Sequence, residues 1–342
     1  MMDLCKHQMS SCEVLSLKIL KIKILIILST FVLTITTINL TCAYLFLSHK
    51  LPDKKIVIIK PHLTIDQIGD LLEKESIIKY KQIFKFTAKI YSLFRPLKSG
   101  EYKFTAGITP YQVLIKLSSG TSIIHRLFIP EGTTVHEIIE KINSDDRIFG
   151  RIITPVPEGF LMPSTYFYSY GDQKEKIISK MRLNMTKTLD KAMLKLSPNS
   201  PLKTRMDVLI LASIIEKEAA DDIERPLIAG VFINRLKMGM KLQADPTVIY
   251  AITEGKFKLG RNLTRTDLQI DSPYNTYKIT GLPTGPITCP GAASIMAAVM
   301  PAKTDALFFV VNKFGNHSFS NNLKEHNTNV QYYRESLKNF PN

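Results

Sequence analysis

The sequence predicts an α+β protein with a single N-terminal transmembrane helix, a small α+β module and a larger C-terminal α+β domain. Three observations carry this prediction: an uncharged apolar run near the N-terminus, short strand-like and helical segments in alternation after it, and a dense set of polar motifs towards the C-terminus. A chain of 342 residues has room for an anchor and roughly two domains of about 100–200 residues. The predicted boundaries are 1–22 for the N-terminal flank, 23–47 for the transmembrane helix, 53–130 for the module and 131–342 for the C-terminal domain.

The chain is strongly basic, with 45 Lys and Arg against 30 Asp and Glu and a formal net charge of +15. Such a balance favours an anionic partner, which could be a nucleic acid, a lipid surface or an acidic polymer. The sequence has no zinc-ligand pattern, no nucleic-acid recognition motif and no Arg-rich arm. Its basic residues are spread along the whole chain. We therefore expect no nucleic-acid partner, and a long anionic surface such as a cell wall or a headgroup layer instead.

The apolar run from Ile24 to Leu47 contains no charged residue. A membrane-spanning helix needs about 20 apolar residues, whereas the apolar core of a signal peptide has only about 7–15. The run also continues past Cys42-Ala43, a weak candidate cleavage site, so an uncleaved anchor in the lipid bilayer is predicted. Short basic flanks stay in the cytoplasm, and large translocated domains escape this charge rule. The preceding lysines are Lys6, Lys18, Lys21 and Lys23.

This orientation places everything after the anchor outside the membrane, in a bacterial periplasm or its equivalent. No ATP or NAD pool exists there, so we expect a function that needs neither a nucleotide nor a soluble cofactor. The cysteine pattern predicts no metal site either, because its spacings match no known ligand set. Only Cys289 lies beyond the apolar run, so the exported part has no internal disulfide.

The predicted module alternates strands and helices. Thr64 fits a helix N-cap with Gln67 as its capping-box partner, and Thr109-Pro110 starts another helix that Gly120 stops. This order of elements resembles the LysM-like module that precedes certain cell-wall enzymes. The expected elements are a strand over 55–60, a helix from Thr64, a helix over 79–93, a strand over 100–104 and a helix from Thr109.

The C-terminal domain is expected to begin with a strand over 123–129 and a helix from Thr133. A turn-rich junction over 143–165 follows, with several prolines. Helical periodicity resumes over 174–196 and is broken at 197–201 by Pro and Ser.

A helix is predicted over 207–219, where the sequence lacks Pro and Gly and is apolar at helical spacing. On a helical wheel, Glu218 falls at the edge of the apolar face, whereas Glu216 lies about twice as far from its centre. A carboxyl group pressed against apolar side chains loses solvation, so its pKa rises. That is the property a general acid needs near neutral pH. Taken alone, both glutamates could be ordinary surface acids.

Several stretches after this helix mix turn residues with amides, hydroxyls and aromatic rings. We interpret them as sugar-binding loops, since such groups offer hydrogen bonds and ring faces for stacking on pyranose rings. Taken singly, each could be an ordinary loop. The stretches are VFINRL at 231–236, LQADPTVIY at 242–250, SPYNTY at 272–277, GLPTGPI at 281–287, Pro290-Gly291, HSFS at 317–320 and His326.

These motifs, together with LASIIEKE at 211–218, resemble the YceG-type endolytic murein transglycosylase family (MltG). The resemblance implies that 131–342 is a catalytic domain and that Glu218 is its catalytic residue, in agreement with the helical wheel. It further implies an inner-membrane lyase that needs no cofactor, cuts nascent strands endolytically close to the membrane and thereby ends their elongation. Implied partners are the glycan strands and penicillin-binding proteins. The implied substrate-binding residues are Asn234, Gln243, Tyr250, Tyr274, Asn275 and Thr276.

Other functions remain open at this point. A second essential carboxylate, for which Asp245 and Glu216 are the candidates, would make the protein an ordinary muramidase. A membrane-anchored scaffold that binds peptidoglycan without cutting it is the main alternative outside the enzymes. A pyridoxal-phosphate lyase is disfavoured, because no glycine-rich phosphate cradle is visible and the domain lies outside the cytoplasm.

Overall fold

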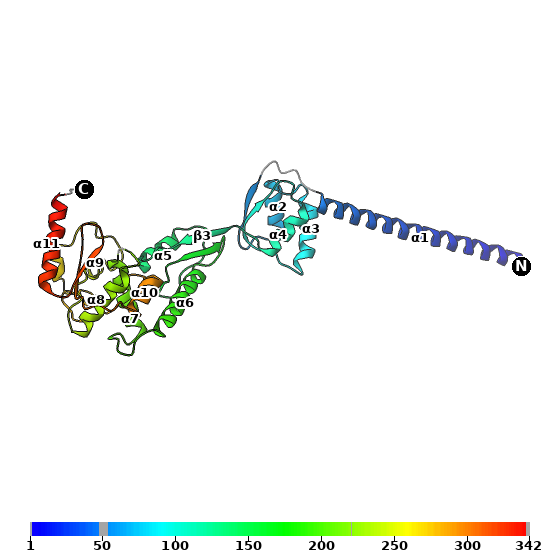
Figure 1. The fold of residues 1–342 in the computed structure, drawn as a ribbon. Helices are drawn as coiled ribbons and strands as arrows, with labels where there is room; N and C mark the ends of the chain where they lie inside the picture. The colour runs from blue at the N-terminus through cyan, green and yellow to red at the C-terminus, as the bar shows by residue number, and fades with distance from the viewer. Residues whose placement is uncertain (1, 48–53, 220, 340–342) are drawn as a thin grey trace. The chain divides into compact units, whose positions relative to one another are not determined.

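The structure, a computed structural model, describes residues 2–47, 54–219 and 221–339 (Figure 1). Its fold is mixed α+β, as the sequence predicts. Residue 53, where the predicted module begins, lies outside the described residues.

The chain divides into two compact units. The first comprises Met1–Ile123 and Ser169–Gly171, and the second comprises Ile124–Tyr168 and Asp172–Asn342. The division falls before the predicted boundary at 130, because the strand that starts at Ile124 belongs to the second unit.

Helix α1 (Met2–Phe46) includes the predicted transmembrane segment. Among the described residues, only its part from Leu15 to Phe46 is long and apolar enough to cross a membrane, with a mean hydropathy of 2.1. The hydroxyls of Thr34 and Thr36 donate to carbonyls one turn earlier, so these polar groups are satisfied within the helix. By length and composition this is a candidate membrane span, in keeping with the prediction.

The rest of the first unit is a small α+β module. Strands β1 and β2 pair antiparallel, with Lys55 opposite Phe104 and Ile59 opposite Gly100. Both predicted helix starts are confirmed, since Thr64 with Gln67 and Thr109 with Gln112 form complete capping boxes. The elements are β1 (Lys55–Ile59), α2 (Ile65–Lys74), α3 (Lys81–Ser92), β2 (Gly100–Phe104) and α4 (Pro110–Ser119).

The second unit begins with β3 and β4, which form a two-stranded sheet. The turn-rich junction predicted over 143–165 ends where β4 begins, and this strand was not predicted from the sequence. Tyr166 and Tyr168 are buried while Phe167 between them is exposed, the two-residue alternation of a strand. The elements here are β3 (Ile124–Phe128), α5 (Val135–Asn143), β4 (Thr165–Ser169) and α6 (Lys174–Met193).

Two of the stretches interpreted as loops are helical, which corrects the prediction. VFINRL lies inside α8, where Ile228, Val231 and Phe232 are buried at helical spacing. DPTVIY forms most of α9, which Pro246 starts at a position where a missing N–H costs nothing. The later elements are α7 (Arg205–Glu218), α8 (Arg225–Lys237), α9 (Asp245–Thr253), η1 (Asp267–Gln269), α10 (Ala292–Val299), β5 (Phe308–Val311), β6 (His317–Ser320) and α11 (Leu323–Asn339).

Helix α7 is the central element of the second unit. It packs against α6, α8, α9 and α10, and Figure 1 shows α7 beside α10. Every residue from Val208 to Ile215 is buried. The helical wheel predicted a single buried face, which is wrong, because neighbouring helices cover α7 on all sides.

Candidate active site

Glu218 is the last residue of α7. The helix starts at the N-cap Thr204, which forms a capping box with Asp207, and its backbone turns extended at Ala219. The core residues end at Ile215, so the side chain of Glu218 projects from the end of the buried stretch and is itself only partly buried. It has no hydrogen bond or ion pair to any residue that the structure describes.

Glu218 lies on a pocket of about 420 Å³, which we call the Glu218 pocket. Aromatic and aliphatic side chains from β5 and the start of α11 form part of its wall. The pocket is thus a partly apolar hollow in which a poorly hydrated carboxyl group meets several polar groups. Its polar lining is Arg235, Gln243, Asp245, Tyr277, His326 and Asn327, and its apolar lining is Leu242, Phe308, Phe309 and Leu323.

The surroundings of Glu218 raise its pKa from 4.5 to about 7. Burial is the largest cause, because it penalises the charged carboxylate. The negative charge of Asp245 adds to this rise, and the positive charge of Arg235 opposes it. Glu218 can therefore hold a proton near neutral pH and release it in the same range, as a group that acts in turn as acid and base must do.

Asp245 opens α9 and supplies a second carboxylate to the pocket. Its Oδ1 accepts a hydrogen bond of 2.6 Å from the hydroxyl of Tyr277. Burial and this contact raise the pKa of Tyr277, so the phenol keeps its proton and remains a donor.

Arg235 is only 7% exposed and anchors one side of the pocket. Its Nε donates to the Leu307 carbonyl at 2.6 Å and its Nη1 to the Leu242 carbonyl at 2.7 Å. The guanidinium lies 5.1 Å from the ring centre of Phe308. These contacts place one fixed positive charge close to the two carboxylates of the pocket.

The next stacking partner of Phe308 is His326, whose ring centre lies 5.2 Å away. Burial lowers the pKa of His326, and the charge of Arg235 adds to this effect. The imidazole is therefore neutral at pH 7, and its buried Nδ1 has no hydrogen-bond partner within 2–47, 54–219 and 221–339.

Of the predicted substrate-binding residues, the structure brings only Gln243 onto the Glu218 pocket. Its backbone has a φ of 48° and donates to the carbonyl of Thr276. Thr276 is fully buried and accepts the N–H of Ala244 at 2.9 Å. Asn275 is also fully buried and donates to the Ile270 carbonyl. Thr276 therefore holds the backbone that presents Gln243, and Asn275 holds the loop that carries Thr276.

The remaining three lie around the site rather than in the Glu218 pocket. The Asn234 amide donates to the Thr304 carbonyl at 2.8 Å and to the Ala306 carbonyl at 3.1 Å. Tyr250 and Tyr274 face each other at 4.8 Å between ring centres. A direct sugar contact of these residues stays a prediction.

The predicted set of substrate-binding residues did not include Arg235, Tyr277 or His326, although all three line the pocket. Arg235 and Tyr277 lie inside motifs that the sequence analysis names, directly after the predicted binding residues Asn234 and Thr276. An Arg or Tyr within such a motif is the signal that could have found them.

Glu216, expected to lie further from the core than Glu218, has a side chain that is only 5% exposed, which corrects the wheel. Its carboxylate accepts the N–H of Gly291 at 2.8 Å and an N–H of Arg225 at 3.1 Å. Arg225 also donates to Ser294 of α10. Glu216 therefore ties the end of α7 to α8 and α10, and its charge is already satisfied.

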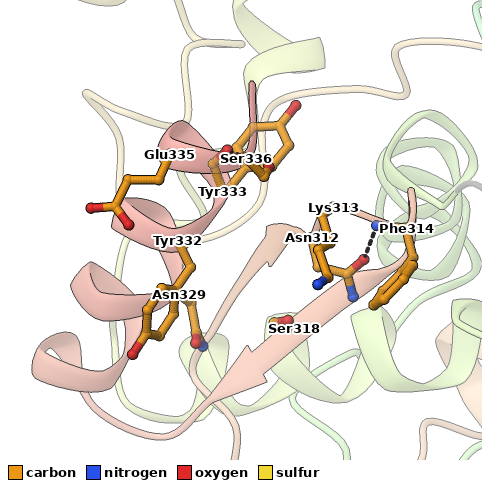
Figure 2. A pocket seen from close by; sticks show the side chains of 9 residues that line it. All are labelled: Asn312, Lys313, Phe314, Ser318, Asn329, Tyr332, Tyr333, Glu335 and Ser336. Atoms are coloured by element: carbon orange, nitrogen blue, oxygen red, sulfur yellow. Dashed lines mark hydrogen bonds between the residues drawn. The ribbon is translucent and has the colours of Figure 1, made fainter. Parts of the chain in front are cut away.

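A further pocket of about 490 Å³ lies between the β5–β6 hairpin and α11 (Figure 2). Figure 2 shows Asn312 bonded to the backbone of Phe314 at the hairpin tip, with Tyr332 of α11 across from it. None of its lining residues lines the Glu218 pocket. Across the described residues, no group of three or more His, Cys, Asp or Glu could hold a metal ion.

A carboxyl group with a pKa of about 7 lies at the end of a buried helix of this α+β domain, beside a second carboxylate in an open pocket. General acid catalysis can use such an arrangement. A family model described as the YceG-like family matches residues 57–332. The chain belongs to this family, which confirms the resemblance seen in its motifs.

Relatives and a solved structure agree with the family model. An endolytic murein transglycosylase of Bacillus subtilis is 32% identical over 80% of this chain and 83% of its own. Another, of Streptococcus pneumoniae, is 30% identical over 80% of this chain and 57% of its own. The crystal structure of a putative YceG-like protein from Listeria monocytogenes matches with a TM-score of 0.51 at 32% identity, over 81% of this chain and 99% of that one.

Proposed function

We propose that this protein is an endolytic murein transglycosylase, with Glu218 as its single acid and base. It cleaves the MurNAc–GlcNAc bond within peptidoglycan glycan strands and leaves 1,6-anhydroMurNAc ends. The observation that carries the proposal is an unpaired carboxyl group on an open pocket, with its pKa raised to about 7. The names of the Bacillus and Streptococcus relatives support the substrate class.

The chemistry requires one carboxyl group that acts twice. Protonated Glu218 gives its proton to the glycosidic oxygen, the bond from that oxygen to C1 breaks, and an oxocarbenium-like sugar forms. Glu218, now a carboxylate, takes the proton of the C6 hydroxyl of the same sugar, and O6 bonds to C1. The nucleophile belongs to the substrate, so neither water nor a second carboxylate has to attack.

Asp245 favours a second candidate, an ordinary muramidase, because it places another carboxylate in the same pocket. In a transglycosylase its negative charge instead stabilises the positive charge that develops on the sugar. The two reactions differ in their products, since hydrolysis leaves a reducing end and transglycosylation leaves an anhydro end.

The test is to digest purified glycan strands with the full-length protein in detergent micelles and to identify the new ends by mass spectrometry. We expect anhydro ends from the wild type and none from Glu218→Gln, with the circular dichroism spectrum unchanged. Glu140→Gln is the matched control, since the Glu140 side chain is 68% exposed and far along the chain from the pocket. Reducing ends would identify a muramidase, and strands bound but uncut would identify a scaffold.

We also propose that α1 anchors the protein in the inner membrane with the catalytic unit in the periplasm. Support comes from the apolar span Leu15–Phe46 and from the lysines that precede or begin it. Alkaline phosphatase fused after the C-terminus should then be active in cells, whereas activity of a cytoplasmic reporter at that place would reverse the orientation. An anchored enzyme that cuts nascent strands near the bilayer would work beside penicillin-binding proteins, our proposed partners.

The module of the first unit is proposed to be LysM-like and to hold glycan. Its two helices follow β1 and precede β2 in the order strand, helix, helix, strand. Removal of residues 54–123 should lower the retention of the protein on insoluble peptidoglycan. Unchanged retention would argue against a binding role.

A further inference from the structure

A second hollow of about 420 Å³, which we call the Lys258 pocket, lies on the same unit. Two pairs of consecutive residues link it to the Glu218 pocket. Lys217 lines it next to Glu218 on α7, and Pro246 lines it next to Asp245 on α9. Consecutive side chains on a helix point about 100° apart, so the two pockets flank the same two helix ends.

The walls of the Lys258 pocket are fixed by hydrogen bonds. The hydroxyl of Thr134 donates to the carbonyl of Gly255 at 2.8 Å, which joins the start of α5 to the loop after α9. Gly255 has a φ of +70°, and a Cβ there would lie 3.0 Å from Thr134 Cγ2. A glycine is therefore required for this close approach, and the pocket is formed before any ligand arrives.

Its floor is apolar and open to solvent. Ile249 is 37% exposed and Phe257 is 59% exposed. Tyr250 and Pro246 complete this part of the lining. Such a floor suits a ligand with aliphatic groups, because contact would remove apolar surface from water on both sides.

The rim carries an excess of positive charge. Lys217 and Lys258 form no ion pair with any residue in the described part of the chain. Arg261 is neutralised by Asp267 through two contacts, of 2.6 Å and 3.0 Å. Glu137 also lines the pocket, but its carboxylate accepts the backbone N–H that begins α5. Two ammonium groups therefore remain available to an anionic ligand.

We propose that the Lys258 pocket binds the acidic peptide stem of the glycan strand while the sugar bond lies at Glu218. This inference rests on the proposed function. A bare glycan offers hydroxyls and amides, which would leave two ammonium groups unused. The peptide on each MurNAc carries carboxylates together with methyl and alkyl groups, and it branches from the very sugar whose C1 is attacked. Its charge and apolar groups match the rim and the floor.

The test uses the full chain in detergent micelles and two substrates: glycan strands with peptide stems, and the same strands stripped of peptide by an amidase. Lys258→Ala should raise KM for the peptide-bearing strands by up to about fivefold, the upper end of the effect of losing one exposed ion pair, with kcat unchanged. The stripped strands should be cleaved by the variant as by the wild type. Phe257→Ala should show the same contrast.

Lys256→Ala is the matched control, because Lys256 lies two residues away, is paired with Glu254 and does not line the pocket. It should leave both KM values unchanged. Equal KM changes on both substrates, or none on either, would overturn the inference while the proposed function stood. Absence of anhydro ends from both substrates with the wild type would overturn the proposed function itself.

Discussion

The hydroxyl of Tyr277 donates a hydrogen bond of 2.6 Å to Oδ1 of Asp245 on the wall of the Glu218 pocket. This contact orients the Asp245 carboxylate, which lines the pocket. Asp245 in turn contributes to the raised pKa of Glu218. The proton that the proposed reaction needs is thus retained by burial first and, in addition, by a charge on α9, an element separate from α7.

Asp245→Asn should move the alkaline limb of the pH–rate profile to lower pH. Glu218 must be protonated to act as the acid, so kcat/KM falls as pH rises through its pKa of about 7. Removal of the negative charge lowers that pKa, and activity is then lost at a lower pH. Tyr277→Phe is the comparison, because it keeps the charge at Asp245. An unmoved limb in Asp245→Asn would show that Asp245 does not influence the acid.

Glu218→Gln should become more stable than the wild type as pH rises. The folded pKa of Glu218 lies above its unfolded value, so the folded state holds the proton more tightly. The wild type therefore loses stability between pH 4.5 and about 7, by at most about 3 kcal/mol. Glutamine has no such loss. Urea unfolding at pH 5 and pH 8 checks this, and a constant difference between the two proteins would contradict it.

Glu216→Gln should destabilise the fold by about 1–3 kcal/mol, because Arg225 loses one of its charged partners and the Gly291 N–H loses its charged acceptor. A slower reaction with an unchanged alkaline limb and unchanged anhydro products is expected, since Glu216 would act by positioning α7. Denaturant unfolding and product analysis give both readouts. Glu140→Gln, at an exposed site, should change neither. If the wild type instead made reducing ends, and Glu216→Gln lost them while Glu140→Gln kept them, Glu216 would be a second reacting carboxylate.

The sequence was sufficient for the module because its signals are local. Thr64 with Gln67 and Thr109 with Gln112 lie three residues apart, and each pair forms its capping box without help from the rest of the chain. The same is true of Gly120, whose φ of 74° ends α4.

The surroundings of the site depend on long-range packing, which a local pattern does not encode. The Asn234 amide was predicted to bind sugar, yet it donates its hydrogen bonds to the carbonyls of Thr304 and Ala306, about 70 residues later in the chain. Glu216 resembled an exposed acid because a wheel takes account only of its own helix, and α8 and α10 supply its partners. Glu218 was selected on a local pattern, its place at the end of an apolar helix, and its catalytic role stays a prediction.

Arg235→Met should move the alkaline limb in the direction opposite to Asp245→Asn. The charge of Arg235 lowers the pKa of Glu218, so its removal lets that pKa rise and activity persist to higher pH. The variant also leaves the Leu307 and Leu242 carbonyls without donors, at a cost of about 1–3 kcal/mol each. Arg235→Lys separates the two effects, because lysine keeps the positive charge but cannot donate to both carbonyls as the guanidinium does. The free energy of unfolding should therefore fall while the alkaline limb stays at the same pH. If Asp245→Asn and Arg235→Met moved the alkaline limb of the pH–rate profile in the same direction, the charges of these two residues would not control the pKa of Glu218.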